Sequence, residues 1–348
     1  MSDKNSKPKS NRRKTLTIVC VILGVILALL LAGVVYVEYL LDQMHYVDSD
    51  AMQQGLSQSE IDAILGATDD GDEDASLPTM NPEDVLLESY DGVGIGTEAH
   101  IVNILLIGAD YQGTDHPRSD TTILVTFNTE AKTLTMTSFM RDLYVNIPGY
   151  AKNKLNAAYS LGGMSLLKKT LNENFGIYVD GIVEVDFTQF IGIIDLLGGV
   201  DLELTSSEAS WINKKAGSSL SEGMQHLTGR EAIWYARNRT SNGGGDYNRT
   251  NRQRTLLNTL LDTYKNASLT TIVGMLDDIL PMITTDMTKT EITNYVTVLF
   301  PLLLESEVVS QRIPIDDGHY MTKINGLSVL VPDLAENVQF LQDTLLGE

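Results

Sequence analysis

The chain is poor in cysteine: its 348 residues include only one, Cys20. This residue lies in an apolar run, so the rest of the chain can form no disulfide and offers no thiol nucleophile or thiolate ligand. Three catalytic motifs are also absent, namely the Gly-x-Ser-x-Gly elbow, the His-Glu-x-x-His zinc motif and the Walker A loop. The sequence therefore argues against thiol chemistry, a serine-triad hydrolase, a zinc protease and a P-loop nucleotide hydrolase.

Positive charge is scarce as well. The chain has 25 Lys and Arg against 46 Asp and Glu, a formal net charge of −21. A protein this acidic repels phosphate backbones, so nucleic acid is not an expected partner. Residues 38–100 contain no Lys or Arg at all, whereas the first 14 residues contain six.

An uncharged apolar run at 15–37 separates these two regions. As a helix rising ~1.5 Å per residue, it is long enough to cross a hydrocarbon core of roughly 30 Å. A cleavable signal peptide is the alternative, but its apolar part would be shorter and followed by small residues. We therefore expect a single-pass membrane anchor in contact with membrane lipid. The basic first 14 residues predict a cytoplasmic N-terminus and an extracytoplasmic remainder.

This topology predicts four segments: a cytoplasmic tail at 1–14, the anchor at 15–37, an acidic extracellular linker at 38–98 and a folded extracytoplasmic domain at 99–348. The linker is punctuated by Gly and Pro and should be extended or disordered, with a short helix near 57–66. An extracytoplasmic domain without disulfides fits a bacterium with a thick external wall, a Gram-positive one.

Beyond residue 99, apolar runs of strand length alternate with helical patterns. We expect a strand at 100–110, a hairpin from 121–129 and 132–140, and a strand-helix-strand unit at 181–204. The other expected elements are two short helices within 156–176, helices at 228–239, 246–265, 271–281, 288–304 and 333–346, and a strand at 307–315. This alternation predicts an α/β domain with a central mixed β-sheet flanked by helices.

Five arginines surround a triple glycine in the stretch Tyr235–Arg254, at positions 237, 239, 249, 252 and 254. Asp246 is a suitable N-cap for the second helix, and Arg249 and Gln253 follow it on one helix face. Guanidinium groups beside a helix N-terminus match the geometry of phosphate oxygens. The stretch therefore predicts a pyrophosphate pocket, with a surface network of salt bridges as the alternative.

Acids and arginines also stand at the ends of the first three predicted strands. Asp110 ends the first strand, Arg118 and Asp120 precede the second, and Arg141 follows the third together with Asp142. Side chains at strand ends can converge on one edge of a sheet. Two carboxylates with open water positions suit Mg²⁺ or Mn²⁺ shared with substrate phosphates.

Seven ordered motifs resemble the LytR-CpsA-Psr family of cell-wall glycopolymer ligases over about residues 100–265. They are "NILLIGAD", "RSDTTILVTFN", "RDLYVNIPG", "KLNAAYSLGG", "VEVDFTQFIGIIDLLGGVDLEL", "GMQHLTGREAIWYARNR" and "DYNRTNRQR". The residue before Arg141 is usually proline in the family and is Met140 here, which puts the local backbone in doubt rather than the activity.

The resemblance implies an α-β-α catalytic domain that binds a polyprenyl pyrophosphate, with the lipid tail in an apolar tunnel. It implies a metal, Mg²⁺ or Mn²⁺, on Asp110 and Asp120. The residues implied to hold the phosphates are Arg118, Arg141, Arg237, Arg239 and Arg249. Asp246 and Gln253 would orient these arginines, and Lys154 would lie at the rim. The residues expected to be catalytic are Arg118, Arg141, Asp246 and Arg249.

The implied activity is a metal-assisted phosphotransfer from a polyprenyl-pyrophosphate carrier. A glycopolymer, such as a teichoic acid or a capsular polysaccharide, would move to a sugar hydroxyl of peptidoglycan. Two alternatives remain open on sequence alone: a polyprenyl-pyrophosphate phosphatase, and a lipid- or wall-binding protein without turnover. A transcription attenuator is disfavoured because a 14-residue tail cannot form a helix-turn-helix.

Overall fold

The computed structural model describes residue 33 and residues 35–48, 56–66, 76–92, 94–111, 116–241, 245–265 and 268–346. The chain divides into two compact units, Met1–Met44 and His45–Glu348. The described part of the first unit is mostly helical up to residue 41. The predicted tail and most of the predicted anchor lie outside the described residues. Within the described residues, no helix has the length and apolar character needed to span a membrane.

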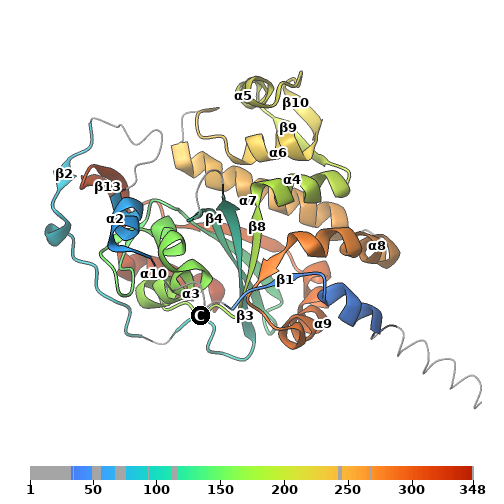
Figure 1. The fold of residues 1–348 in the computed structure, drawn as a ribbon, viewed down its shortest axis with the longest axis horizontal. Coiled ribbons are helices and arrows are strands. Elements are labelled where there is room, and N and C mark those ends of the chain that lie inside the picture. The colour runs from blue at the N-terminus through green and yellow to red at the C-terminus, as the bar shows by residue number, and fades with distance from the viewer. Residues whose placement is uncertain are drawn as a thin grey trace, which may run out of the picture. The chain divides into compact units, whose positions relative to one another are not determined.

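A seven-stranded mixed sheet forms the centre of the second unit (Figure 1). In spatial order its strands are β1 (His45–Tyr46), β11 (Thr284–Thr285), β8 (Gly181–Asp186), β3 (Ile101–Asp110), β4 (Arg118–Asn128), β5 (Thr133–Phe139) and β12 (Val308–Ile313). β3, β4 and β5 are antiparallel neighbours, while β8 joins β3 and β12 joins β5 in parallel. The predicted hairpin and the predicted mixed sheet are confirmed.

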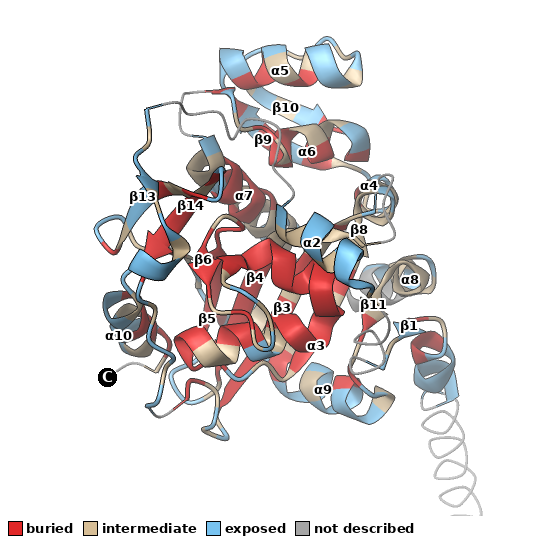
Figure 2. Ribbon diagram, turned by 60° about the vertical axis from the view of Figure 1, so that its left-hand side comes forward, coloured by how far each residue is buried: buried red, intermediate tan, exposed pale blue. Residues whose placement is uncertain are grey.

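Helices cover both faces of this sheet, because successive strand residues point to opposite sides. On one face, Leu124 packs in a cluster with residues of α3 (Leu155–Phe175) and α10 (Leu334–Leu345). On the other face, Ile123 and Val125 pack with residues of α9 (Lys289–Glu305) and α7 (Gly245–Lys265). Figure 2 shows α3 and the central strands as the most continuously buried part of the molecule. The domain is therefore a three-layer α-β-α structure.

The α3 region matches the prediction of two helical segments. Its helix is interrupted at Gly162 and Gly163, which have non-helical dihedral angles. Gly163 has φ +58°, a conformation that L side chains rarely adopt. The glycine pair breaks the helix while keeping both halves in the core.

A separate apolar cluster lies beyond the sheet and packs against α7 through Leu256 and Leu260. It is built by α4 (Phe187–Leu196), β9 (Val200–Leu204), α5 (Ser206–Ala216), β10 (Gly223–Leu227) and α6 (Gly229–Ala236). The strand-helix-strand prediction is confirmed by β8, α4 and β9, whereas α5 and β10 were not anticipated. The capping box predicted for α6 is present, because Thr228 and Glu231 bond reciprocally at its first turn.

The short helix predicted near 57–66 is confirmed, but the described parts of the predicted linker pack against the domain and are not simply extended. α2 (Gln58–Gly66) packs against the main core, and the Asn153 side-chain amide donates to the Leu65 carbonyl at 2.9 Å. β2 (Thr79–Met80) pairs with β13 (His319–Ile324), which also pairs with β14 (Leu327–Pro332). Apolar residues spaced along an acidic segment, such as the buried Ile95, account for this packing.

The C-terminal residues complete the fold. They supply β11 and β12 to the central sheet and α10 to the core. The remaining short elements are β6 (Tyr144–Val145), β7 (Asn153–Lys154) and α8 (Leu269–Ile279), and the 3-10 turns η2 (Pro82–Asp84) and η4 (Leu280–Met282).

Candidate functional site

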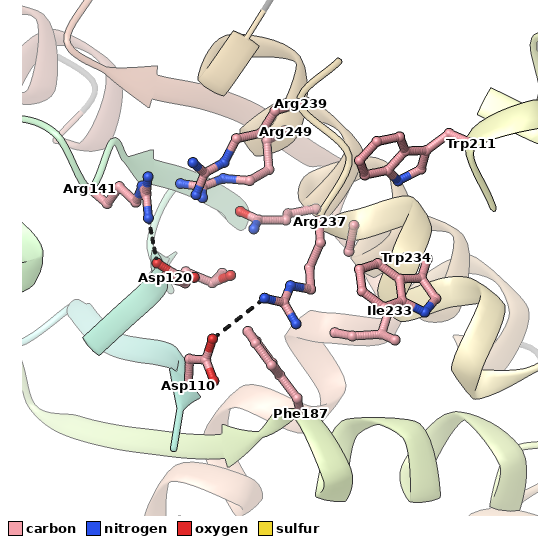
Figure 3. A pocket seen from close by; sticks show the side chains of 13 residues that line it. Asp110, Asp120, Arg141, Phe187, Trp211, Ile233, Trp234, Arg237, Arg239 and Arg249 are labelled. Carbon is pink, nitrogen blue, oxygen red and sulfur yellow. Dashed lines mark hydrogen bonds and ion pairs between the residues drawn. The ribbon is translucent and has the colours of Figure 1, made fainter. Parts of the chain in front are cut away.

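A cavity of about 380 Å³ opens where the ends of β3 and β4 face α6 and α7 (Figure 3). Most of the predicted site residues line it. The lining comprises Asp110, Asp120, Thr121, Arg141, Phe187, Trp211, Ile233, Trp234, Ala236, Arg237, Arg239, Arg249 and Gln253. Segments separated by more than 100 residues in the sequence therefore build one site.

A β-bulge directs Asp120 into the cavity. Gly108 pairs with Thr121 and Ala109 pairs with Ser119, which leaves Asp120 as an extra residue in β4. In a regular strand, Asp120 and Thr121 would point to opposite faces. Both line the cavity because the bulge locally turns the strand, a device found often beside active sites.

Three arginines surround the carboxylate of Asp246. Its Oδ1 lies 2.7 Å from Arg249 Nη2, 3.7 Å from Arg239 Nε and 3.9 Å from Arg141 Nε. Asp246 lies in the first turn of α7, one residue inside the helix, so the prediction that it caps this helix is wrong. Its side chain instead holds together guanidinium groups from β5's end, the 237–241 loop and α7.

Arg141 also links this cluster to the sheet. Its Nη1 donates to Asp120 Oδ1 at 2.9 Å, and both side chains are largely buried. Burial alone would raise the pKa of Asp120, but the charges of Arg141 and Arg249 and the hydrogen bond more than compensate. The pKa of Asp120 falls to about 2, so this carboxylate is ionised at neutral pH.

Three predicted site residues, Asp246, Lys154 and Arg118, are not among the residues that line the cavity. Lys154 is buried, with 3% of its surface exposed, and its Nζ lies 3.0 Å from Asp142 Oδ1. Asp142 Oδ2 in turn lies 3.7 Å from Arg141 Nε, so Lys154 lies behind the arginine cluster rather than at the rim. Arg118 begins β4 opposite Asp110 and is not among the lining residues.

An aromatic wall faces the charged wall, and sequence reasoning missed it. Phe187, Trp211, Ile233 and Trp234 lie on the side of the cavity away from Arg141 and Arg249 (Figure 3).

Arg237 joins the two walls. Its guanidinium lies 4.3 Å from the Phe187 ring centroid and 5.4 Å from that of Trp234, and its Nη2 lies 3.5 Å from Asp110 Oδ2. The spacing of Trp234 on α6 and Arg237 at its C-cap, three residues apart, was the one signal that could have suggested this contact.

The other two arginines of the stretch Tyr235–Arg254 are Arg252 and Arg254, and neither lines the cavity. Arg252 is a structural support: its Nε donates to Glu208 Oε1 at 2.7 Å, Nη1 to the Asn238 carbonyl at 2.7 Å and Nη2 to the Ser241 carbonyl at 3.1 Å. These bonds fix the loop that carries Arg239. Arg254 Nε and Nη1, by contrast, are buried without a hydrogen-bond partner in the described part of the chain.

The carboxylates fit a metal that is shared with substrate. Asp110 and Asp120 both line the cavity, and the described residues contain no group of three or more His, Cys, Asp or Glu side chains that could hold a metal alone. Mg²⁺ commonly takes one or two protein carboxylates and completes its shell with phosphate oxygens and water. The site therefore joins two hard anionic ligands to a set of phosphate-matching cations beside an apolar wall.

The sequence matches a known protein family and curated relatives from two bacteria. The LytR_cpsA_psr family model matches residues 68–344. Regulatory protein MsrR of Staphylococcus aureus is 40% identical over 161 residues, 46% of this chain and 48% of the relative. The polyisoprenyl-teichoic acid–peptidoglycan teichoic acid transferase TagV of Bacillus subtilis is 34% identical over 208 residues, 55% of this chain and 52% of TagV. The chain thus spans about half the length of the curated relatives it matches.

Solved structures show the same fold. TagT bound to LIIa-WTA superimposes with a TM-score of 0.59 and 30% identity, over 71% of this chain and 91% of TagT. A TagT structure with bound octaprenyl pyrophosphate lipid superimposes with a TM-score of 0.55 and 28% identity, with the same coverage. The matched span and the shared fold establish that this chain belongs to the LytR_cpsA_psr family.

Proposed function

We propose that this protein transfers a glycopolymer, such as a teichoic acid or a capsular polysaccharide, from a polyprenyl-pyrophosphate carrier to peptidoglycan. The observation that carries the proposal is the cavity, in which two carboxylates face a cluster of buried arginines beside an aromatic wall. The solved relative TagT binds octaprenyl pyrophosphate lipid, and TagV is a teichoic acid transferase.

The arginines are arranged to receive a pyrophosphate. Burial lowers the pKa of Arg239, and the nearby charges of Arg249 and Arg141 lower it further. One carboxylate, Asp246, is shared among the three guanidinium groups. The free site thus concentrates positive charge in a partly desolvated place. An incoming pyrophosphate relieves this repulsion and can accept bidentate hydrogen bonds.

Mg²⁺ or Mn²⁺ would be held by Asp110 and Asp120 together with phosphate oxygens. When bound, the metal supplies positive charge that polarises the phosphoryl group. Asp120 is ionised throughout the neutral range, as a hard metal ligand must be.

The reaction forms one P–O bond and breaks another. A sugar hydroxyl of the glycan, which the family suggests is the 6-hydroxyl of an N-acetylmuramic acid residue, attacks the sugar-linked phosphorus. The P–O bond to the polyprenyl phosphate breaks, and polyprenyl monophosphate leaves. Arg141 and Arg249 stabilise the charge on the transferred phosphoryl group, while Arg239 neutralises the departing phosphate. The hydroxyl proton passes to the leaving phosphate, whose second pKa is about 6.

The aromatic wall suits the first isoprene units of the carrier. Phe187, Ile233 and Trp234 present an apolar surface next to the arginines, so a prenyl chain attached to the pyrophosphate could leave the charged zone directly. The stacking of Arg237 on Phe187 keeps this wall in place while Arg237 also reaches Asp110.

We also propose that residues 15–37 anchor the protein with its N-terminus in the cytoplasm and its catalytic domain outside. The test replaces Cys20 by Ser and the exposed Ser219 by Cys. A membrane-impermeant maleimide should then label intact cells. Labelling that requires cell lysis would refute this orientation.

The transfer itself is tested with full-length protein in detergent micelles. The protein is mixed with a labelled polyprenyl-pyrophosphate oligosaccharide, peptidoglycan glycan strands and Mg²⁺. Label should move onto the glycan, and Arg141→Ala or a chelator should abolish the transfer. Arg230→Ala removes an exposed arginine on α6 and serves as the matched control, with unchanged transfer.

Other outcomes would select the alternatives. Release of label as a free sugar phosphate, without transfer to the glycan, would indicate a phosphatase. Retention of intact lipid without any product, with a glycan preparation verified as acceptor, would indicate a binding protein.

A further inference from the structure

A second pair of arginines lies between α7 and β12, outside the cavity described above. Arg254 belongs to α7 and Arg312 to β12, and neither lines the cavity. Tyr247, one helical repeat of seven residues before Arg254, lies on the same face of α7. Arg312 stacks on the Tyr247 ring, with 4.4 Å between its Cζ and the ring centroid.

Arg254 is a buried cation with two donor atoms that no acceptor of the described residues satisfies. It is 7% exposed, and its Nε and Nη1 atoms are buried with no hydrogen-bond partner among the described residues. Burial lowers its pKa to about 10, and the like charge of Arg312 contributes in the same direction. Two neighbouring guanidinium groups in a desolvated place repel each other unless an anion lies between them.

Arg312 is the member of this pair that is partly exposed to solvent. Its side chain is 21% exposed, and its Nη2 pairs with the carboxylate of Asp316, which is 84% exposed. Its Nε is buried without a hydrogen-bond partner among the described residues. Exposed ion pairs contribute little to stability, so the Asp316 carboxylate can be exchanged for another oxyanion.

Ser138 adds an uncharged hydrogen-bond donor on the sheet face that carries Arg312. It stands directly across from Arg312 in the β5–β12 pairing, so both side chains share one sheet face. Met136, two residues before Ser138, packs on the face covered by α7 and α9. The Ser138 Oγ is buried and makes no hydrogen bond within the described residues.

The aromatic neighbour is held rigidly. The Nδ1 of His319 lies 2.9 Å from the Ile315 carbonyl and donates to it, which leaves Nε2 to accept the hydrogen bond of the Tyr247 hydroxyl. Tyr247 therefore fixes the plane of the Arg312 guanidinium. It also follows Asp246 in the sequence, which places this arginine pair beside the proposed pyrophosphate pocket.

We propose that Arg254, Arg312 and the Ser138 hydroxyl form an oxyanion subsite that binds one of the two polymers. The ligand is a phosphodiester group of the glycopolymer or a carboxylate of the peptidoglycan peptide. These groups share the chemistry that two guanidinium donors and a hydroxyl recognise, and Asp316 occupies part of the subsite in the free protein. Naming the glycopolymer or the peptidoglycan peptide as the source of the anion rests on the proposed function. The existence of an anion site does not rest on it.

The test measures binding to full-length protein in detergent micelles by calorimetry. Three probes are used: a glycerol phosphate oligomer with phosphodiester groups, a muramyl peptide with free carboxylates, and geranylgeranyl pyrophosphate. Arg254→Gln should weaken binding of the oligomer or of the peptide by at least about tenfold, since a charge-assisted hydrogen bond is lost. The dissociation constant of geranylgeranyl pyrophosphate should change by less than about twofold.

Two further variants keep the outcome clear. Asp316→Asn removes the competing carboxylate from the surface and should strengthen binding of the same probe. Arg254→Gln should also raise the melting temperature, because it removes an unpaired buried charge, whereas Arg230→Gln makes the same charge change on the surface of α6 and should change neither property.

The possible results separate the two proposals. No binding of the oligomer or the peptide to the unmodified protein would overturn the subsite, as would binding that Arg254→Gln leaves unchanged. A lowered melting temperature in Arg254→Gln with unchanged binding would show that the arginine is purely structural. In a further outcome, the unmodified protein fails to bind geranylgeranyl pyrophosphate while its oligomer binding still depends on Arg254. This result would refute the proposed function and leave the subsite standing.

Discussion

Replacing Asp246 by Asn should lower the melting temperature of the free protein. It should also increase the rise in melting temperature that pyrophosphate causes. The substitution keeps the shape of the side chain but removes the one carboxylate shared by Arg141, Arg239 and Arg249. The side chain of Asp246 is only 13% exposed, so water cannot replace the lost charge efficiently. Three mutually repelling guanidinium groups would then lack the carboxylate that lies within 4 Å of all three, and Asp120 would be left as the nearest shared negative charge.

The distances set the scale of the effect. At an effective dielectric constant of about 20, the 2.7 Å contact with Arg249 corresponds to about 6 kcal/mol of Coulomb energy. Desolvation cancels much of this, and removing one partner of a buried pair typically costs about 3–5 kcal/mol. Taking about 3 kcal/mol as the loss, and about 2–4 °C per kcal/mol for a domain of this size, the melting temperature should fall by roughly 6–12 °C.

The assay is a thermal melt with and without inorganic pyrophosphate. Pyrophosphate at 100 times its dissociation constant adds about 2.7 kcal/mol to the unmodified protein, and the shift should be larger in Asp246→Asn at the same concentration. Asp262→Asn makes the same chemical change at an exposed position of α7 and should melt like the unmodified protein. Equal melting of both variants, or a smaller pyrophosphate shift in Asp246→Asn, would refute the reasoning.

Three other substitutions test the packing that supports the site. For each, the free energy of unfolding is measured in urea. Arg252→Gln leaves Glu208 buried without its charged partner and should lower the free energy of unfolding by about 3 kcal/mol; a loss below about 1 kcal/mol would contradict the support role. Leu341→Ala opens a cavity under α10 and should cost about 2–5 kcal/mol, whereas no loss would show that α10 is not part of the core. Gly229→Ala would bring a methyl group within 2.2 Å of the Ile191 carbonyl oxygen, so α4 and α6 must separate and stability must fall; unchanged stability would contradict this close contact.

Local interactions explain what could be predicted from the sequence. The capping box of α6 depends on two residues three positions apart, Thr228 and Glu231, and the β4–β5 hairpin depends on alternation within two adjacent runs. The glycine pair that breaks α3 is likewise visible in the sequence. Such signals act over a few residues, so the chain reveals them without its tertiary structure.

Lys154 is an example of a residue whose burial could not be predicted from local sequence signals. Its position in a family motif suggested the rim of the pocket, but it is buried against Asp142, behind Arg141. The described parts of 38–98 show the same limit, because their acidic composition concealed spaced apolar residues such as Ile95 that pack into the core. Burial depends on what the rest of the chain supplies, which composition does not encode.

The sequence by itself determined the charged residues of the site and the α/β class, since both follow from residue type and local spacing. Only the tertiary structure decided which of these residues meet. It placed Phe187 and Trp234 opposite the arginines, and a bulge turned Asp120 toward Arg141. It also separated Arg254 from the cavity that Asp110 and Asp120 line, and set it beside Arg312, 58 positions further along the chain. The physical reason is that packing brings together side chains from distant segments, and their charges interact only across the distances that packing sets.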